Sequence, residues 1–112
     1  MGFLGKLANK VLRASVVKIG VSLGSTFANG VLGTGHKNGV NAIIIMNSAY
    51  KEDYAFIKDD ILECTIMEMG QRYNYGGGIY SGNKYQVKFK DGKSALLVVF
   101  GQYLATFEGI VF

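Results

Sequence analysis

Residues 84–100 read Lys84-Tyr-Gln-Val-Lys-Phe-Lys-Asp-Gly-Lys-Ser-Ala-Leu-Leu-Val-Val-Phe100, and this stretch predicts an antiparallel hairpin. Tyr85, Val87 and Phe89 alternate with basic and amide side chains, which is typical of a strand with one buried and one solvated face. Asp91-Gly92 supplies a tight turn, because glycine tolerates the positive φ that such a turn requires. The returning strand is apolar on both faces, so another element must cover its second face.

The end of the chain is the expected cover. Leu104, Phe107 and Val111 recur at positions i, i+3 and i+7, which predicts a helix over residues 102–112 packed on the sheet. Gly109 and the β-branched residues beside it have low helix propensity. A final strand is therefore the alternative.

Upstream of the hairpin, short apolar runs alternate with charged turns. A continuous β-branched run at residues 41–46 suits a strand buried on both faces, and further strands are predicted at 54–57 and 61–69. The side chains expected on one side of the last strand are Leu62, Cys64 and Ile66. These elements predict a mainly antiparallel, bent sheet of five to six strands.

This succession of elements resembles a known family. The resemblance rests on a strand, the turn Lys58-Asp-Asp-Ile61, a long strand, a glycine-rich loop, the motif Tyr85-Gln-Val-Lys-Phe-Lys-Asp-Gly-Lys93 and a helix ending in Phe112. Over about residues 40–112, the chain resembles small bacterial pleckstrin-homology-like domains. The resemblance implies a strongly bent antiparallel sheet capped by a C-terminal helix. Such domains bind lipid headgroups, dock proteins or self-assemble, so the resemblance implies a fold without one particular activity.

The net charge of +4 is distributed unevenly along the 112 residues. Residues 1–38 hold five bases and no acid, whereas residues 39–112 hold seven bases and eight acids, a net charge of −1. This asymmetry suggests a cationic segment appended to a nearly neutral domain, and a cluster of glycines places the boundary near residues 33–39. The expected organisation is an α+β fold with a cationic amphipathic helical segment over residues 1–35 and a sheet domain with a C-terminal helix over residues 36–112.

Residues 2–15 predict an amphipathic helix. Apolar residues fall at i, i+3, i+4, i+7 and i+8, while the bases fall on the opposite side. A cationic helix with Phe and Leu opposite its lysines is typical of segments that lie in a membrane interface. The candidate membrane-contact residues are Phe3, Leu4, Lys6, Leu7, Lys10, Val11, Arg13 and Lys18.

The apolar character continues over residues 14–29, where a second helix is the expectation. Gly20, Gly24 and Ala28 are spaced four apart, so they would share one helix face and allow close self-association. Lys18 interrupts the apolar run, which makes the segment a poor transmembrane span. As an alternative to membrane binding or self-association, the N-terminal helix covers the open face of its own domain.

The sequence contains few groups that could support catalysis or bind a metal. One Cys and one His exclude an internal disulfide and a closed zinc site. A phosphate-binding loop fails because Gly35 is followed by His36 instead of the required lysine and hydroxyl residue. Cys64 is expected to be a buried, inert thiol, and Asp59 and Asp60 to lie in a turn. We therefore expect no enzyme, no cofactor and no metal.

A basic and aromatic region surrounds the triple glycine at residues 76–78. Tyrosine supplies amphipathic contact area, so this region is a candidate contact loop, with a solvated strand face as the plainer interpretation. The candidate partner-contact residues are Arg72, Tyr73, Tyr75, Tyr80, Lys84 and Lys88. Nucleic-acid binding is the third hypothesis, because nearby acidic residues dilute the basic field.

These observations predict a non-enzymatic binding or adaptor module. We expect it to associate with a membrane surface or a larger assembly through its N-terminal helix. A self-assembling structural protein is the alternative. The expected partners are an anionic membrane surface or a second copy of the chain, with a protein partner for the sheet domain. The free cysteine and the lack of a good signal peptide predict a cytoplasmic protein, peripheral to the inner face of the membrane.

Overall fold

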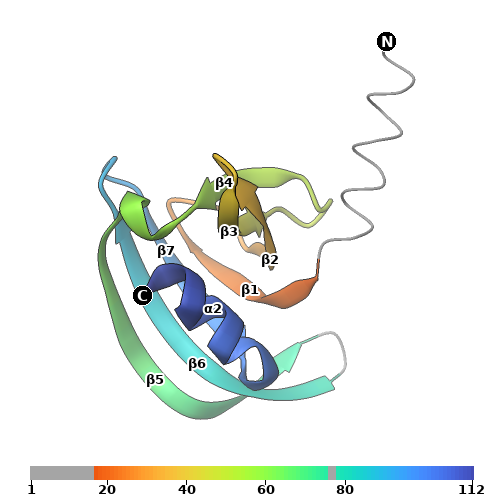
Figure 1. The fold of residues 1–112 in the computed structure, drawn as a ribbon. Coiled ribbons are helices and arrows are strands. Elements are labelled where there is room, and N and C mark those ends of the chain that lie inside the picture. Colours follow the sequence, from red (N-terminus) through yellow and green to blue (C-terminus); the bar gives the residue numbers. More distant parts are fainter. Residues whose placement is uncertain (1–16, 76–77) are drawn as a thin grey trace.

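The computed structural model describes residues 17–75 and 78–112, in which one antiparallel sheet curves around a single C-terminal helix (Figure 1). The strands are β1 (Lys18–Ser25), β2 (Gly30–Lys37), β3 (Val40–Met46), β4 (Glu52–Phe56), β5 (Ile61–Tyr75), β6 (Gly78–Phe89) and β7 (Ser94–Phe100). The helical elements are the short turns η1 (Lys58–Asp60) and η2 (Gly101–Tyr103) and the helix α2 (Leu104–Val111).

The seven strands are ordered β4-β3-β2-β1-β7-β6-β5, and every neighbouring pair is antiparallel. The chain meanders through β1 to β4, crosses by η1, and meanders back through β5 to β7, which pairs with β1. The two edge strands, β4 and β5, are therefore consecutive in the chain. The sheet remains open between them, and α2 lies across its concave side (Figure 1).

Glycines allow the strands to approach closely where the sheet bends. A Cβ atom on Gly20 of β1 would collide with the carbonyl oxygen of Val98 on β7. A Cβ on Gly82 of β6 would likewise collide with the carbonyl oxygen of Val99. These glycines permit a backbone approach that no other residue allows.

The core lies between the concave face of the sheet and α2. Tyr85, Val87 and Phe89 point inward from β6 and are at most 1% exposed, as their alternation predicts. Phe107 and Val111 supply the buried face of α2, and the rings of Tyr85 and Phe107 lie 4.7 Å apart. The prediction of a C-terminal helix is therefore confirmed, and the alternative of a final strand is wrong.

The expectation of helix over residues 14–29 is wrong for its described part. Residues 18–25 form β1, a central strand between β2 and β7, and residues 30–37 form β2. Strand pairing on both sides satisfies the backbone here, while each glycine would cost a helix about 0.8–1.0 kcal/mol. The sheet therefore has seven strands instead of five to six, and the α+β fold with an N-terminal helix is corrected to a mainly antiparallel β fold with one short helix among the described residues.

The domain boundary expected near residues 33–39 falls within β2 and its turn into β3. These two strands pair continuously as a hairpin across that point. The predicted contacts at Phe3, Leu4, Lys6, Leu7, Lys10, Val11 and Arg13 lie outside the described residues. Lys18 is exposed and opens β1.

Candidate interaction surface on the β5–β6 hairpin

The hairpin formed by β5 and β6 extends past the rest of the sheet. β6 pairs with β7 only as far as Gly82, which lies opposite Phe100. Beyond that point, residues 71–75 and 78–81 pair only with each other. They form a two-stranded ribbon at the edge of the molecule (Figure 1).

Strand β5 contains three bulges opposite β6. Its register shifts between Ile61 and Glu63, between Ile66 and Glu68, and between Glu68 and Gln71. Each shift inserts one extra residue, so 15 residues of β5 pair with 12 residues of β6. The inserted positions are Leu62, Met67 and the pair Met69-Gly70, where Gly70 has a φ of +63°.

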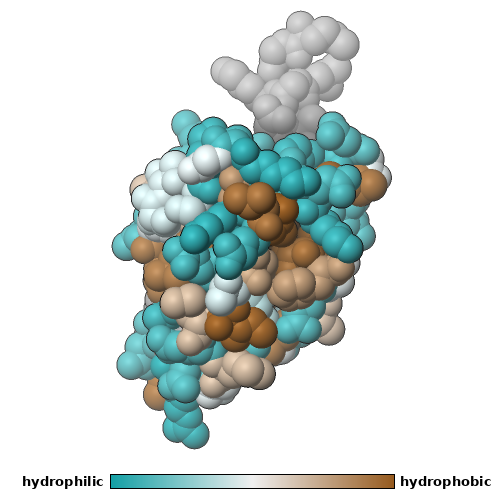
Figure 2. All heavy atoms as spheres, turned by 90° about the vertical axis from the view of Figure 1, so that its left-hand side faces the viewer, coloured by the Kyte–Doolittle hydropathy of each residue, from teal (hydrophilic) through white to brown (hydrophobic). Residues whose placement is uncertain are grey.

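The bulges turn large apolar side chains toward solvent. A bulge breaks the alternation of a strand and re-aims the inserted side chain, so these residues do not follow the inward side of β5. The exposed apolar side chains of the hairpin are Leu62 (68%), Ile66 (41%), Met67 (52%), Met69 (67%) and Ile79 (68%). We call these five residues the apolar hairpin surface. Figure 2, which views the left-hand side of Figure 1, shows apolar patches set among hydrophilic ones.

The expected grouping of Leu62, Cys64 and Ile66 on one side is corrected by the first bulge. Cys64 is half-buried and packs against the core, whereas the side chain of Leu62 is 68% exposed. Desolvation raises the pKa of the Cys64 thiol to about 11, which keeps the thiol protonated.

Charges divide the hairpin into two halves. Near the sheet, Glu68 pairs with Lys84 at 3.1 Å, and Glu63 lies 4.0 Å from Lys88. Toward the far end, Arg72 is exposed, and no Asp or Glu occurs from residue 69 to residue 90. The half next to the core is thus charge-compensated, while the far half is cationic.

A chain of hydrogen bonds fixes the point where the hairpin leaves the sheet. The backbone N–H of Gly70 donates to Oδ1 of Asn83 at 3.0 Å, and Nδ2 of Asn83 donates to the Tyr85 hydroxyl at 3.3 Å. The Tyr85 hydroxyl in turn donates to Oε1 of Glu108 at 3.0 Å. The third bulge is therefore tied through the core to α2.

The structure places every predicted partner-contact residue on this hairpin. Tyr73 faces Tyr80 across the two strands, and Arg72 faces Ser81. Tyr75 pairs with Gly78 at the end of the ladder. Lys84 and Lys88 lie in the charge-compensated half described above.

The apolar hairpin surface itself was missed in the sequence analysis. The only local signal was the two methionines in Ile66-Met-Glu-Met69, since methionine is common at adaptable binding surfaces. Bulge positions depend on the partner strand, which a local pattern does not reveal.

The residues proposed for self-association do not share a face. Gly20 lies inside β1 against β7, Gly24 lies near the end of β1 with a φ of +93°, and Ala28 lies in the connection to β2. The helix face that would have joined two copies is therefore absent.

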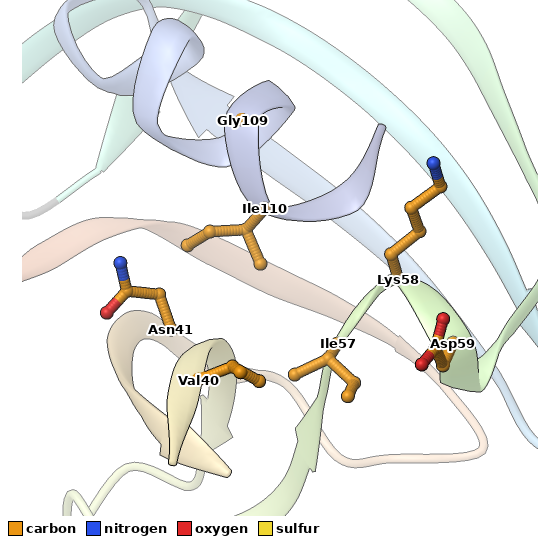
Figure 3. A pocket seen from close by; sticks show the side chains of 7 residues that line it. All are labelled: Val40, Asn41, Ile57, Lys58, Asp59, Gly109 and Ile110. Atoms are coloured by element: carbon orange, nitrogen blue, oxygen red, sulfur yellow. The ribbon is translucent and has the colours of Figure 1, made fainter. Parts of the chain in front are cut away.

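A pocket of about 330 Å³ lies where α2 ends, between the start of β3 and η1. Val40, Ile57 and Ile110 converge on it, and Lys58 and Asp59 lie at its rim (Figure 3). Its lining contains no Ser, Cys or His, and it combines apolar side chains with the polar side chains of Asn41, Lys58 and Asp59 in an open depression.

The remaining candidate groups are separate from one another in the fold. His36 is exposed on β2, while Cys64 lies on β5 at the edge of the sheet. Asp60 forms an ion pair with Lys37 at 2.8 Å, so it joins η1 to β2. Among residues 17–75 and 78–112, no three His, Cys, Asp or Glu side chains gather where they could hold a metal, and no helix has the length and apolarity to cross a membrane.

No protein-family model, curated protein or solved structure matches the chain.

Proposed function

We propose that the chain is a non-enzymatic binding module. It attaches to an anionic membrane surface or a larger assembly through its cationic N-terminal residues, and it presents the β5–β6 hairpin to a protein partner. The observation that carries the proposal is the exposure of Leu62, Ile66 and Met67 on the half of the hairpin next to the core, two of them at bulges.

The exposure of large apolar side chains supports an interaction role for this hairpin. A single exposed apolar residue is ordinary, whereas several large apolar side chains exposed on one hairpin favour an interaction site. The described residues include nine large apolar side chains that are well exposed, and five of these belong to the hairpin. A partner that covered these side chains would gain roughly 25 cal/mol of binding free energy for each Å² of apolar surface buried.

The bulges also indicate how a partner would be held. A regular edge strand can accept a further strand through its free N–H and C=O groups. Three bulges interrupt that series on β5, which disfavours strand addition. We therefore expect contacts through the side chains of Leu62, Ile66 and Met67, where flexible methionine can adapt to the partner's shape.

The resemblance to pleckstrin-homology-like domains is consistent with this proposal. A strongly bent antiparallel sheet with a C-terminal helix is the arrangement that the resemblance implies. Because such domains commonly bind lipids or proteins, the resemblance favours a binding role without specifying the partner.

A photo-crosslinking experiment tests the partner surface. Benzoylphenylalanine replaces Leu62, and the matched control replaces Val40, which is exposed but lies at the start of β3. In cells that naturally produce the protein, irradiation should give a discrete protein adduct at position 62 and none at position 40. Equal or absent adducts at both positions would contradict a partner surface on β5.

Charge reversal tests the attachment. A variant with Lys6→Glu, Lys10→Glu and Arg13→Glu should lose binding to phosphatidylserine vesicles in co-sedimentation, because each base near an anionic surface contributes on the order of 1 kcal/mol. Thermal unfolding confirms that the variant remains folded. Unchanged vesicle binding would contradict the attachment. Truncation at residue 36 is unsuitable, since it would remove β1 and most of β2 from the sheet.

A further inference from the structure

The strand register places the far half of the hairpin beside the start of β1. In β1, Gly20 lies opposite Val99 of β7, and in β6, Gly82 lies opposite Phe100. Lys18 and the ribbon beyond Gly82 therefore extend past the same end of β7. Figure 1 shows the start of β1 and the end of β5 on the same side of the molecule.

The far half of the hairpin is apolar and cationic at once. Met69 and Ile79 are about two-thirds exposed, and Arg72 is exposed between them along the ribbon. Residues 69–82 hold no acid and one base, Arg72, so this end of the hairpin carries a net positive charge. Near the sheet, by contrast, Glu63 and Glu68 compensate the lysines of β6.

These properties complement an anionic bilayer. Apolar side chains enter the boundary between headgroups and acyl chains, and bases remain among the anionic headgroups.

We propose that Met69, Arg72 and Ile79 form a second contact with an anionic lipid bilayer, at the end of the sheet where β1 begins. This inference rests on the proposed function, because it assumes attachment through the N-terminal residues. Once those residues are bound, the hairpin meets the same surface at high effective concentration, so a weak contact adds to the overall affinity. The domain then has a fixed orientation, with the half of the hairpin next to the core held away from the lipid.

A fluorophore experiment tests the orientation directly. Leu62 and Ile79 are equally exposed, at 68% each, and lie near opposite ends of the hairpin. Leu62 is next to Glu63, which lies opposite Lys88 of β6. Lys88 is nine positions along β6 from Ile79, a distance of roughly 30 Å in a strand. In a Cys64→Ser background, Ile79→Cys and Leu62→Cys are each labelled with an environment-sensitive fluorophore. Phosphatidylcholine vesicles with about one third phosphatidylserine serve as the probe.

The expected result is a shift to shorter emission wavelength at position 79 and no shift at position 62. Equal spectra at both positions, with the protein still sedimenting with the vesicles, would overturn the second contact and leave the attachment intact. Failure of the full chain to sediment with the vesicles would overturn the proposed attachment and the second contact together. An equal shift on pure phosphatidylcholine vesicles would overturn the role of anionic lipid.

Affinity measurements use a matched pair of charge variants. Arg72→Gln should weaken vesicle binding about fivefold, as expected for one base near an anionic surface. Lys90→Gln removes the same charge at the opposite end of β6, and its affinity should stay within about twofold of the original. Equal losses for the two variants would overturn the proposal. Thermal midpoints confirm that both variants are folded.

Discussion

The hydroxyl of Tyr85 donates a hydrogen bond to Oε1 of Glu108 at 3.0 Å, from a side chain that has no exposed surface. The same hydroxyl accepts from Asn83, whose amide oxygen holds the N–H of Gly70. A single buried phenol therefore connects the last helix, the middle of β6 and the third bulge of β5. The direction in which the far half of the hairpin leaves the sheet depends on this chain of bonds.

Tyr85→Phe should destabilise the domain by about 1–2 kcal/mol, because it leaves the buried amide of Asn83 without its acceptor. Urea unfolding at neutral pH measures the loss. Glu108→Gln keeps an acceptor oxygen for the phenol and should cost less. Equal free energies of unfolding for Tyr85→Phe and the original protein would contradict the role given to this hydroxyl.

Gly20→Ala should destabilise the sheet by more than about 2 kcal/mol, because its Cβ would collide with the carbonyl oxygen of Val98. Gly109→Ala is the matched control. It lies in α2, where an added Cβ would meet no atom within 4 Å. Alanine should stabilise this helix by roughly 0.5–1 kcal/mol. Thermal or urea unfolding of both variants checks the opposite signs, and a mild effect of Gly20→Ala would argue against the close approach of β1 and β7.

The ion pair between Lys37 and Asp60 makes stability depend on acid pH. Partial burial acts to raise the pKa of Asp60, but the hydrogen bonds from Lys37 and from the N–H of Ile57 prevail and lower it below 3.8. The unfolded chain then binds more protons in this range, so the contribution is present above about pH 4 and is lost as pH falls through the lowered pKa.

Asp60→Asn should therefore flatten the acid limb of the stability curve below about pH 4, as measured by urea unfolding. At neutral pH the loss should be modest, up to about 1 kcal/mol, because both side chains are partly exposed. An acid limb as steep as in the original protein would assign the dependence to another carboxylate.

Cys64 should react slowly with a disulfide reagent in the native protein. Desolvation raises its pKa to about 11, so the reactive thiolate at pH 7.5 is roughly 100-fold rarer than for a free cysteine. Ile79→Cys in a Cys64→Ser background, at an exposed site, should react at close to the free-thiol rate. Addition of urea should bring Cys64 to the same rate. Fast reaction of native Cys64 would contradict its half-buried placement on β5.

Local patterns in the sequence were sufficient for much of the β6–β7 hairpin and for the C-terminal helix. Alternation at Tyr85, Val87 and Phe89 reflects the two-residue period of a strand, and the spacing of Leu104, Phe107 and Val111 reflects the period of a helix. Asp91-Gly92 marks the turn through its backbone chemistry. Each of these signals lies within a few residues, so the sequence carries it without knowledge of the partner strand.

The strand β1 and the bulges of β5 were decided by tertiary structure. Four-residue spacing of Gly20 and Gly24 fits a helix face, but in the fold Gly20 serves the close contact with β7, a strand more than 70 residues away. Leu62, Met67 and Met69 became exposed because β5 inserts residues against β6. The sequence by itself determined which segments are apolar, alternating or turn-forming, because those are local properties. Only pairing between distant strands decided register, bulges and exposure, because a shift of one residue exchanges the two faces of a strand.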